Sequence, residues 1–478
     1  MVANFGQWDY NALSYFSESA RGKIDMKIVI VGGGKVGFAI AREVSGEGHD
    51  VTIIDDNRAN VERLSVALDT MVIQGDGTTL QAQRAAGVGQ SDLLIAATPN
   101  DEVNILCCIL AKKLGCPNNI ARIRRWEYKE ELHLLREELG LSMMVTPDAS
   151  AAREVFRMLQ FPGFLKRESF AKSRVEIVAF EVREDSILNG KKLLDLPRVL
   201  RQKVLVCAVQ RGGNAIIPDG SFQLQMGDEI FVTAPAAELS RLMEQVGLRK
   251  KTARNVMIIG GGGLGTGLAM LLSEAGVKVK LLEKNTERAR LLAETLPNVM
   301  VLNADGTRQE ILHSENISQM DAVVALTNMD EENVFICMYA NMMGVPQSIP
   351  KVNRTEYGAV CLNCGIRYTV SPKEICAQEI TRYVRAMQST EAERVLSMYT
   401  LMDGKVEALE FEVTADVPHL GEKLADVHFK PNILLACITR DGKVLFPGGG
   451  DSLRSGDIVV VVTPRNRVIV DLRDIFAD

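Results

Sequence analysis

Residues 30–37, Ile-Val-Gly-Gly-Gly-Lys-Val-Gly, decide the fold of the first domain of this chain. They lie between a β-branched run and an amphipathic stretch, so a Gly-x-Gly-x-x-Gly pattern joins a predicted strand to a predicted helix. In this context Gly32 permits a tight turn, Gly34 lets a pyrophosphate approach the backbone, and Gly37 lets the helix pack close to the strand. The helix N-terminus offers unpaired N–H groups to phosphates. The stretch therefore predicts a Rossmann-like, dinucleotide-binding domain.

An acidic residue ends the second predicted strand. Asp55 lies 18 residues after Gly37. A carboxylate at this point accepts hydrogen bonds from a ribose 2′-hydroxyl and repels a 2′-phosphate, so NAD(H) or another adenine nucleotide is favoured over NADP. Lys35 adds positive charge to the loop, which suits ATP or ADP as well as NAD(H). A solvated lysine at the start of a helix is the alternative interpretation of Lys35.

The same pattern occurs a second time in the chain. Residues 258–265 repeat the glycine run, and residues 304–307 and 326–333 repeat the motifs at 75–78 and 97–104, about 229 positions later. Self-similarity at one offset, held over several motifs, indicates a duplicated structural unit. The chain is therefore two tandem copies of one unit of roughly 225–230 residues.

The two copies differ in charge at the predicted ligand sites. Lys35 of the first glycine loop is replaced by Gly263 in the second loop, and Arg124 is replaced by Asn353. The first site therefore has more positive charge with which to bind a polyphosphate. We expect ATP or ADP at the first site, and the second site is a weaker candidate for a triphosphate.

Each copy changes character partway along its length. Its first part alternates β-branched strands with amphipathic stretches, which predicts a parallel sheet with right-handed crossovers. Its last part has short strands separated by Gly-Asp turns, which predicts a small α+β domain. The fold class is therefore α/β, with two tandem Rossmann-like nucleotide-binding domains, each followed by a small α+β C-terminal domain. In chain order we expect an N-terminal extension (1–25), the first Rossmann-like domain (26–148), a connecting helix and linker (149–174), the first C-terminal domain (175–250), the second Rossmann-like domain (254–372), a second connecting helix and linker (373–403) and the second C-terminal domain (404–478).

Composition argues against several classes of protein. The chain has 478 residues and a formal net charge of −6, so it lacks the basic footprint of a nucleic-acid-binding protein. Nine cysteines without regular spacing do not form a disulfide framework and favour a reducing, cytoplasmic compartment. No run approaches the ~18–20 apolar residues of a membrane-spanning helix. The sequence therefore predicts a cytoplasmic, multidomain protein.

The chain also lacks recognisable catalytic residues. None of the five histidines lies in an acid–base setting, and no Gly-x-x-x-x-Gly-Lys motif for ATP hydrolysis is present. Cys361 and Cys364 form an isolated Cys-x-x-Cys pair, without the further ligands that a zinc site needs. We therefore predict no catalytic residues and no metal site. An NAD-dependent oxidoreductase is the alternative, and a redox-sensing, DNA-binding regulator is a weaker one.

Together, these motifs resemble the KTN/RCK family of nucleotide-binding domains. The resemblance rests on the fingerprint at 32–37, Asp55, the Gly-Asp-Gly-Thr turn at 75–78, the stretch at 97–104 and residues 121–124. Two tandem copies in one chain resemble the regulatory subunits of Trk potassium-uptake systems. The resemblance implies a non-enzymatic gating subunit that senses NAD(H) and ATP/ADP and passes conformational change to a membrane potassium transporter subunit. It also implies a homo-oligomeric ring, dimer or tetramer, at the cytoplasmic face of the inner membrane, and no nucleic-acid partner.

The resemblance further assigns binding roles to individual positions. The glycine loop and Lys35 would hold phosphates, Asp55 would hold ribose, and Asp76 would lie beside the adenine. Thr98 would line the cleft, and Arg122 would face phosphate or a neighbouring subunit. The implied cofactor-binding residues are Gly32, Gly34, Lys35, Val36, Gly37, Asp55, Asp76, Thr98 and Arg122 in the first copy, and Gly260, Gly262, Leu264, Gly265, Glu283, Asp305, Thr327 and Lys351 in the second.

Overall fold

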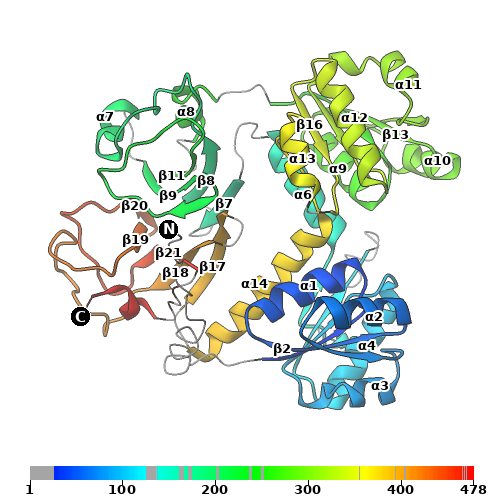
Figure 1. The fold of residues 1–478 in the computed structure, drawn as a ribbon, viewed down its shortest axis with the longest axis horizontal. Helices are drawn as coiled ribbons and strands as arrows, with labels where there is room; N and C mark the ends of the chain where they lie inside the picture. The colour runs from blue at the N-terminus through cyan, green and yellow to red at the C-terminus, as the bar shows by residue number, and fades with distance from the viewer. Residues whose placement is uncertain are drawn as a thin grey trace, which may run out of the picture.

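The structure is a computed structural model of the chain, and Figure 1 shows two α/β domains on one side and two small sheet domains on the other. The N-terminal extension predicted for residues 1–25 lies outside the described residues. The described residues are 26–124, 136, 138–160, 166–170, 175–200, 204–235, 239–248, 252–354, 356–392, 395–402, 405–465, 467, 469 and 471–477.

The first α/β domain is built on a parallel, six-stranded sheet with the strand order β3-β2-β1-β4-β5-β6. In the central strand β1, Ile28 and Ile30 enter the core on one side of the sheet, and Val29 and Val31 enter the core on the other side. Burial on both faces explains why this strand is an almost continuous apolar run. The elements are β1 (Lys27–Val31), α1 (Lys35–Gly46), β2 (Asp50–Asp55), α2 (Arg58–Ala67), β3 (Met71–Gln74), α3 (Leu80–Ala85), β4 (Leu93–Ala96), α4 (Asp101–Leu114), β5 (Asn118–Arg122) and β6 (Met143–Val145).

The second α/β domain repeats this arrangement with the strand order β14-β13-β12-β15-β16, again parallel. In both domains the chain winds outward from the first strand in two directions, so a crevice opens at the carboxyl ends of the first and fourth strands. Each glycine loop lies at the crevice of its own domain. The elements are β12 (Asn255–Ile259), α9 (Gly263–Glu274), β13 (Lys278–Glu283), α10 (Thr286–Thr295), β14 (Met300–Asn303), α11 (Gln309–Ser314), β15 (Ala322–Ala325), α12 (Asp330–Met342), β16 (Gln347–Pro350) and α13 (Tyr357–Asn363).

Each small domain is a five-stranded antiparallel sheet. Partly buried ion pairs hold the Gly-Asp turns, because Nε of Arg211 donates to Asp228 at 2.7 Å and Nε of Arg440 donates to Asp457 at 2.8 Å. The first sheet has β7 (Lys166–Phe170), β8 (Val175–Glu181), β9 (Leu205–Arg211), β10 (Asn214–Ile216) and β11 (Glu229–Pro235), with helices α7 (Leu196–Leu200) and α8 (Leu239–Gln245). The second has β17 (Val395–Leu401), β18 (Val406–Glu412), β19 (Leu434–Arg440), β20 (Lys443–Leu445) and β21 (Ile458–Pro464).

The connecting segments differ from the prediction. The expected helices are present as α6 (Pro147–Gln160) and α14 (Pro372–Ala392), but strands β7 and β17 lie where linkers were predicted, within 149–174 and 373–403. Each is an edge strand that pairs with one neighbour, β8 or β18. An edge strand is held by backbone hydrogen bonds along one side only, so its sequence needs no continuous apolar run. The hydrophobic pattern therefore predicts such a strand only weakly.

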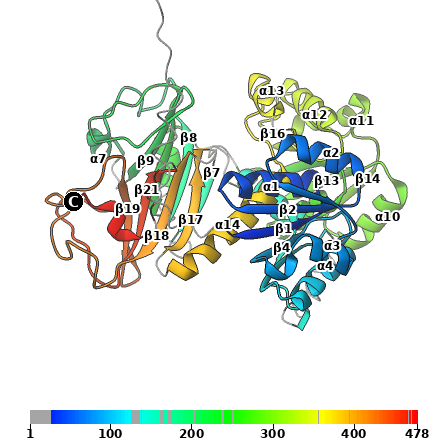
Figure 2. The ribbon, with the colours of Figure 1, turned by 60° about the horizontal axis from the view of Figure 1, so that its bottom comes forward.

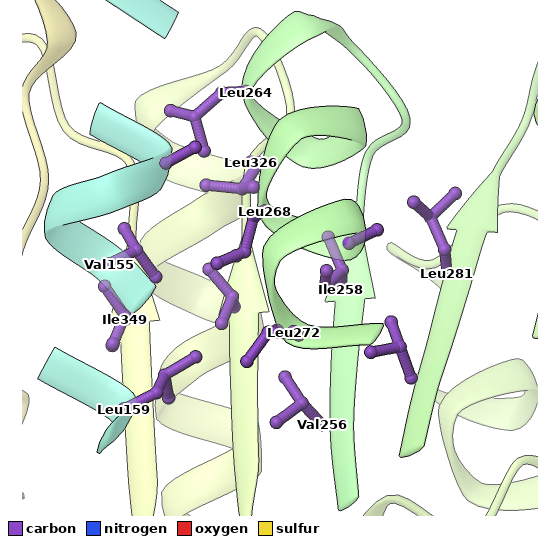
Figure 3. Packing of buried hydrophobic residues seen from close by; sticks show 14 of the residues in the cluster. Val155, Leu159, Val256, Ile258, Leu264, Leu268, Leu272, Leu281, Leu326 and Ile349 are labelled. Carbon is purple, nitrogen blue, oxygen red and sulfur yellow. The ribbon is translucent and has the colours of Figure 1, made fainter. Parts of the chain in front are cut away.

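The two connecting helices are exchanged between the copies. Helix α6 of the first copy packs on α9 of the second α/β domain, where Val155 and Leu159 enter the core beside Leu268 (Figure 3). Helix α14 of the second copy packs on α1 (Figure 1). Its residues Cys376 and Ile380 enter the core of the first α/β domain. Helices α6 and α14 also contact each other. Each α/β domain is therefore completed by a helix from the other copy.

The two small domains also pack against each other (Figure 2). Their shared core contains Ile177 and Phe231 from the first sheet, and Val406 and Val460 from the second. The two copies thus meet both through their α/β domains and through their small domains. Within the described residues, no helix combines the length and the apolarity required to cross a lipid bilayer.

Candidate functional site

The first glycine loop has the backbone geometry that the fingerprint predicts. Gly32 has φ +97°, in the left-handed region, and a Cβ there would lie 2.9 Å from the backbone nitrogen of Thr98. A Cβ on Gly37 would collide with the carbonyl oxygen of Gly32, so α1 can lie this close only with glycine. Gly34 is the N-cap of α1, and a Cβ there would meet no atom of the described residues within 4 Å. The loop therefore leaves open space in front of the helix N-terminus.

The carboxylate of Asp55 is fixed beside this loop. The side chain is 7% exposed, and its Oδ2 accepts a 2.5 Å hydrogen bond from the backbone N–H of Gly33. Its Oδ1 accepts from the backbone N–H of Asn57 at 2.9 Å and from Nδ2 of Asn60 at 3.2 Å. From α2, Arg63 donates to the carbonyl oxygen of Gly33 at 2.8 Å. The acid and the arginine together hold the glycine loop in one conformation.

Asp76 lies on the same side of the cleft, after β3. Its Oδ1 accepts hydrogen bonds from the backbone N–H and the Oγ1 of Thr78, at 2.9 and 2.7 Å. These two bonds favour the ionised form and lower the pKa of Asp76. The site therefore presents a second fixed carboxylate, turned toward solvent.

A buried asparagine organises the opposite wall. Asn104 on α4 is fully buried, and its Oδ1 accepts from the backbone N–H and the Oγ1 of Thr98, at 2.9 and 2.7 Å. Its Nδ2 donates to the carbonyl oxygen of Arg122 at 2.8 Å. Asn104 thus ties the end of β4 to the end of β5. The repeat contains the same arrangement, with Asn333 joining Thr327 to Lys351.

Arg122 has unused hydrogen-bonding capacity at this wall. Its Nη1 donates to the carbonyl oxygen of Thr98 at 3.3 Å, but its buried Nε has no hydrogen-bond partner in the part of the chain that the structure describes. Burial lowers the pKa of Arg122, and the nearby carboxylates of Asp148 and Asp101 act in the opposite direction. A half-buried guanidinium with a free donor is suited to an anionic ligand.

These residues surround one cleft of about 810 Å³, within the size range of small-molecule sites. The first-copy residues predicted to bind cofactor line it, except Gly37, which packs beneath the loop. The cleft also receives residues of the second copy. Those first-copy residues are Gly32, Gly34, Lys35, Val36, Asp55, Asp76, Thr98 and Arg122, and the second-copy residues are Asn328, Lys351, Asn353, Pro372 and Lys373. The cleft is therefore formed by both halves of the chain.

The second glycine loop repeats the local geometry. Gly260 has φ +107°, Gly262 is the N-cap of α9, and a Cβ on Gly265 would collide with the carbonyl oxygen of Gly260. Glu283 takes the role of Asp55, because its Oε2 accepts from the backbone N–H of Gly261 at 2.8 Å. Other predicted second-copy positions behave like their counterparts: Leu264 is buried like Val36, Asp305 has a pKa lowered by Thr307, and Thr327 bonds to Asn333.

The surroundings of the two loops differ. A Cβ on Gly263 would lie 2.6 Å from Oδ2 of Asp148, so a carboxylate from α6 lies directly against the second loop. Lys351, predicted at the second site, also lines the first cleft. Burial lowers the pKa of Lys351; Lys35 acts in the same direction, and Asp148 and Asp330 oppose it. Basic groups from the two copies therefore lie near each other.

Sequence patterns missed several of these residues. Arg63 and its counterpart Arg288, which donates to the carbonyl oxygen of Gly261 at 3.0 Å, lie on exposed helices with no motif around them. Asp148 and Lys373 follow the matching prolines that open α6 and α14. Their opposite charge at one repeat position was a visible signal, but nothing in the sequence showed which loop each one faces.

Two parallel-sheet domains with glycine loops, each joined to a small antiparallel domain, place the chain in the class of proteins with tandem Rossmann-like domains. The chain matches the TrkA-N domain over residues 28–147 and 256–372, and the TrkA-C domain over residues 177–247 and 408–476. It therefore belongs to the TrkA family of Trk system potassium uptake proteins. Membership confirms the predicted family and the prediction of a regulatory rather than an enzymatic protein.

Two curated relatives named Trk system potassium uptake protein TrkA illustrate the similarity. The protein from Vibrio alginolyticus is 31% identical over 460 residues, which cover 94% of this chain and 98% of the relative. The protein from Azorhizobium caulinodans is 30% identical and covers 91% of this chain and 95% of its own.

Solved structures share the fold at low identity. The GsuK channel has a TM-score of 0.63 at 17% identity, covering 95% of this chain and 80% of its own. The GsuK channel bound to NAD has a TM-score of 0.62 at 16% identity, covering 93% and 78%. GsuK bound to ADP has a TM-score of 0.50 at 14% identity, covering 76% and 70%. These similarities confirm the predicted fold class.

Proposed function

We propose that this chain is the cytosolic gating subunit of a Trk-type potassium transporter, and that it binds NAD(H) and ATP or ADP in the first cleft. The observation that carries the proposal is the cleft itself, which lies at the carboxyl edge of the first sheet and is lined by residues of both halves. A nucleotide bound there would contact both halves at once. The structures of GsuK with NAD and with ADP support the choice of ligands for this fold.

The proposed binding mode follows from the hydrogen-bonding capacity of each group. Phosphates would lie in front of α1, against the open backbone at Gly34, with Lys35 and Arg122 supplying positive charge. A carboxylate has about four acceptor positions, and three donors already bond to Asp55, so about one position is left for a ribose hydroxyl. Asp76 can accept from the amino group of an adenine. The second loop has the matching residues, with Glu283 at the ribose position.

Regulation requires that a nucleotide bind two shapes of the protein with different affinity, since equal affinity shifts no equilibrium. A ligand held between the two halves meets this requirement, because a change in their relative position alters its contacts. A γ-phosphate adds charge near Lys35, Arg122 and Lys351, all of which line the cleft. ATP and NAD(H) would therefore stabilise different arrangements of the halves.

The proposed partners are further copies of this chain, forming a dimeric or tetrameric ring, and a TrkH/TrkG-like potassium-translocating subunit. The protein would then lie peripherally on the cytoplasmic face of the inner membrane. The names of the relatives, which are potassium uptake proteins, support this assignment. Large apolar side chains exposed on α12 and α13 of the second α/β domain also support assembly: Phe335 is 68%, Met342 82% and Leu362 64% exposed.

Nucleotide titration of the purified chain, combined with a turnover assay, tests the proposal. We expect saturable binding of NADH and ATP, no net oxidation of NADH in the presence of metabolite mixtures, and co-purification with a Trk-type membrane subunit when the two are expressed together. Steady NADH oxidation would favour the oxidoreductase alternative. Failure to bind any adenine nucleotide would reject the proposed sensing role.

A further inference from the structure

The exchanged helices bring oppositely charged residues to equivalent positions of the two halves. Helices α6 and α14 both begin with proline, and their second residues are Asp148 and Lys373. Residues that enter the cores lie at matching places in the two helices, as Val155 and Ile380 do. The helices are therefore equivalent in structure, and the reversal of charge at their N-terminal ends is a difference between the two ligand sites.

At the second loop, the exchanged residue is acidic. The Oδ2 atom of Asp148 lies so close to Gly263 that a Cβ on this glycine would be 2.6 Å away. Gly263 is the first residue of α9, so the carboxylate lies at the helix N-terminus, where the fingerprint would hold a phosphate. A carboxylate at this point repels a polyphosphate and occupies the space in front of the backbone N–H groups that would otherwise bind it.

At the first cleft, the exchanged residue is basic. Lys373 lines the cleft together with the basic residues Lys35, Arg122 and Lys351 and the carboxylate of Asp148, and the side chain of Lys373 is 17% exposed. Its Nζ lies 3.5 Å from Oε1 of Glu374, whose other oxygen pairs with Arg42 at 3.2 Å. Glu374 is thus shared between two cations, and Lys373 retains donors for a further acceptor because an ammonium group has three.

The buried Nε of Arg122 is a second and independent observation that suits this cleft to an anionic ligand. It has no hydrogen-bond partner among the described residues. An unpaired, buried donor is costly unless a ligand satisfies it. Basic groups from both halves therefore line one polar cleft.

We propose that Lys373 is a phosphate-binding residue that the second half supplies to the first site, and that Asp148 keeps polyphosphate out of the second site. The inference rests on the proposed nucleotide binding and makes it asymmetric. One chain then binds one triphosphate, in the first cleft, although it carries two glycine fingerprints. The ligand bridges the halves through Lys373, and the exchange of helices makes this bridge possible.

The test counts bound ATP on the full chain by equilibrium dialysis and measures the affinities for ATP and for adenosine, which lacks phosphate. The wild-type chain binds one ATP. Lys373→Gln weakens ATP about tenfold, equivalent to ~1.4 kcal/mol, and leaves adenosine unchanged. Lys373→Arg restores most of the ATP affinity. The matched control Lys27→Gln makes the same charge change at the exposed start of β1, on the opposite edge of the sheet, and alters neither affinity.

Asp148→Ala tests the second half of the inference. Removing the carboxylate admits a second, weaker ATP, so the number bound per chain rises to two, whereas Asp148→Glu keeps it at one. Two ATP molecules bound by the wild-type chain, an unchanged count in Asp148→Ala, or equal losses of ATP and adenosine in Lys373→Gln would each overturn the inference while leaving nucleotide binding intact. A wild-type chain that binds no nucleotide rejects the proposed function itself.

Discussion

Replacing Asp55 by asparagine tests how the first site chooses its nucleotide. In the wild-type chain both carboxylate oxygens accept hydrogen bonds, from Gly33 at 2.5 Å and from Asn57 at 2.9 Å. An asparagine has one acceptor oxygen, so one backbone N–H of the loop loses its partner and faces an NH₂ group. Losing one charge-assisted hydrogen bond at this buried position costs about 1.5–3 kcal/mol of unfolding free energy.

The substitution also changes which nucleotide the first site prefers. Two unit charges about 4 Å apart interact by about 4 kcal/mol at an effective dielectric of about 20, and salt screening at the cleft mouth reduces this to about 2 kcal/mol. Asp55→Asn removes this repulsion of a 2′-phosphate and also weakens the bond to a ribose hydroxyl. The ratio of NADPH to NADH dissociation constants should therefore fall by at least about 30-fold, from about 2 kcal/mol.

The assay is a fluorescence titration of both reduced nucleotides against the wild-type chain and Asp55→Asn. Asp321→Asn is the matched control, because Oδ2 of Asp321 accepts hydrogen bonds from the backbone N–H groups of Arg254 and Asn255, both at 2.8 Å, at the edge of the second sheet opposite the glycine loop. The control should lose comparable stability and leave the NADPH to NADH ratio unchanged. If Asp55→Asn weakens both nucleotides by the same factor, the carboxylate shapes only the loop and the reasoning about ribose is refuted.

The remaining predictions concern the architecture of the site. Gly37→Ala should lower the unfolding free energy by about 1–3 kcal/mol, because its Cβ collides with the loop backbone; Gly46→Ala, where a Cβ meets no described atom within 4 Å, should be neutral in the same urea titration. Ile380→Ala, at a position 1% exposed, should cost about 2–5 kcal/mol and weaken ATP binding, since α14 carries Lys373; unchanged stability would argue against helix exchange. Thr78→Val removes a side-chain donor and should raise the pKa of Asp76 toward 3.8, as carboxyl NMR titration can show. Because the folded-state pKa is the lower one, stabilisation by this contact is present above pH 3.8 and is lost as pH falls through the folded pKa.

The sequence predicts the glycine loops well because their chemistry is local. A left-handed turn at Gly32 and a close approach at Gly37 each require glycine, whatever the rest of the chain does. The carboxylate that ends the second strand is equally local, since strand and loop are neighbours in the sheet. The duplication then transfers both predictions to the second copy.

Long-range features were not predictable in the same way. The apolar face of α6 or α14 indicates that the helix packs on something, but the same face fits the core of either copy. The sequence therefore did not predict the exchange of the helices. It also did not predict that Lys373 lies at the first cleft and Asp148 at the second loop. Strands β7 and β17 were missed because edge strands are specified by pairing partners distant in sequence.

The crossed arrangement of α6 and α14 constrains how this gene can be divided. A cut between the two copies would expose, in each fragment, the part of the core that the other copy's helix covers. The fragment's own connecting helix would also expose its apolar face to solvent. Neither fragment should be soluble by itself, yet the pair should reassemble when produced together, because each supplies the piece the other lacks. Fusion of two ancestral units into one polypeptide would make that mutual completion independent of protein concentration.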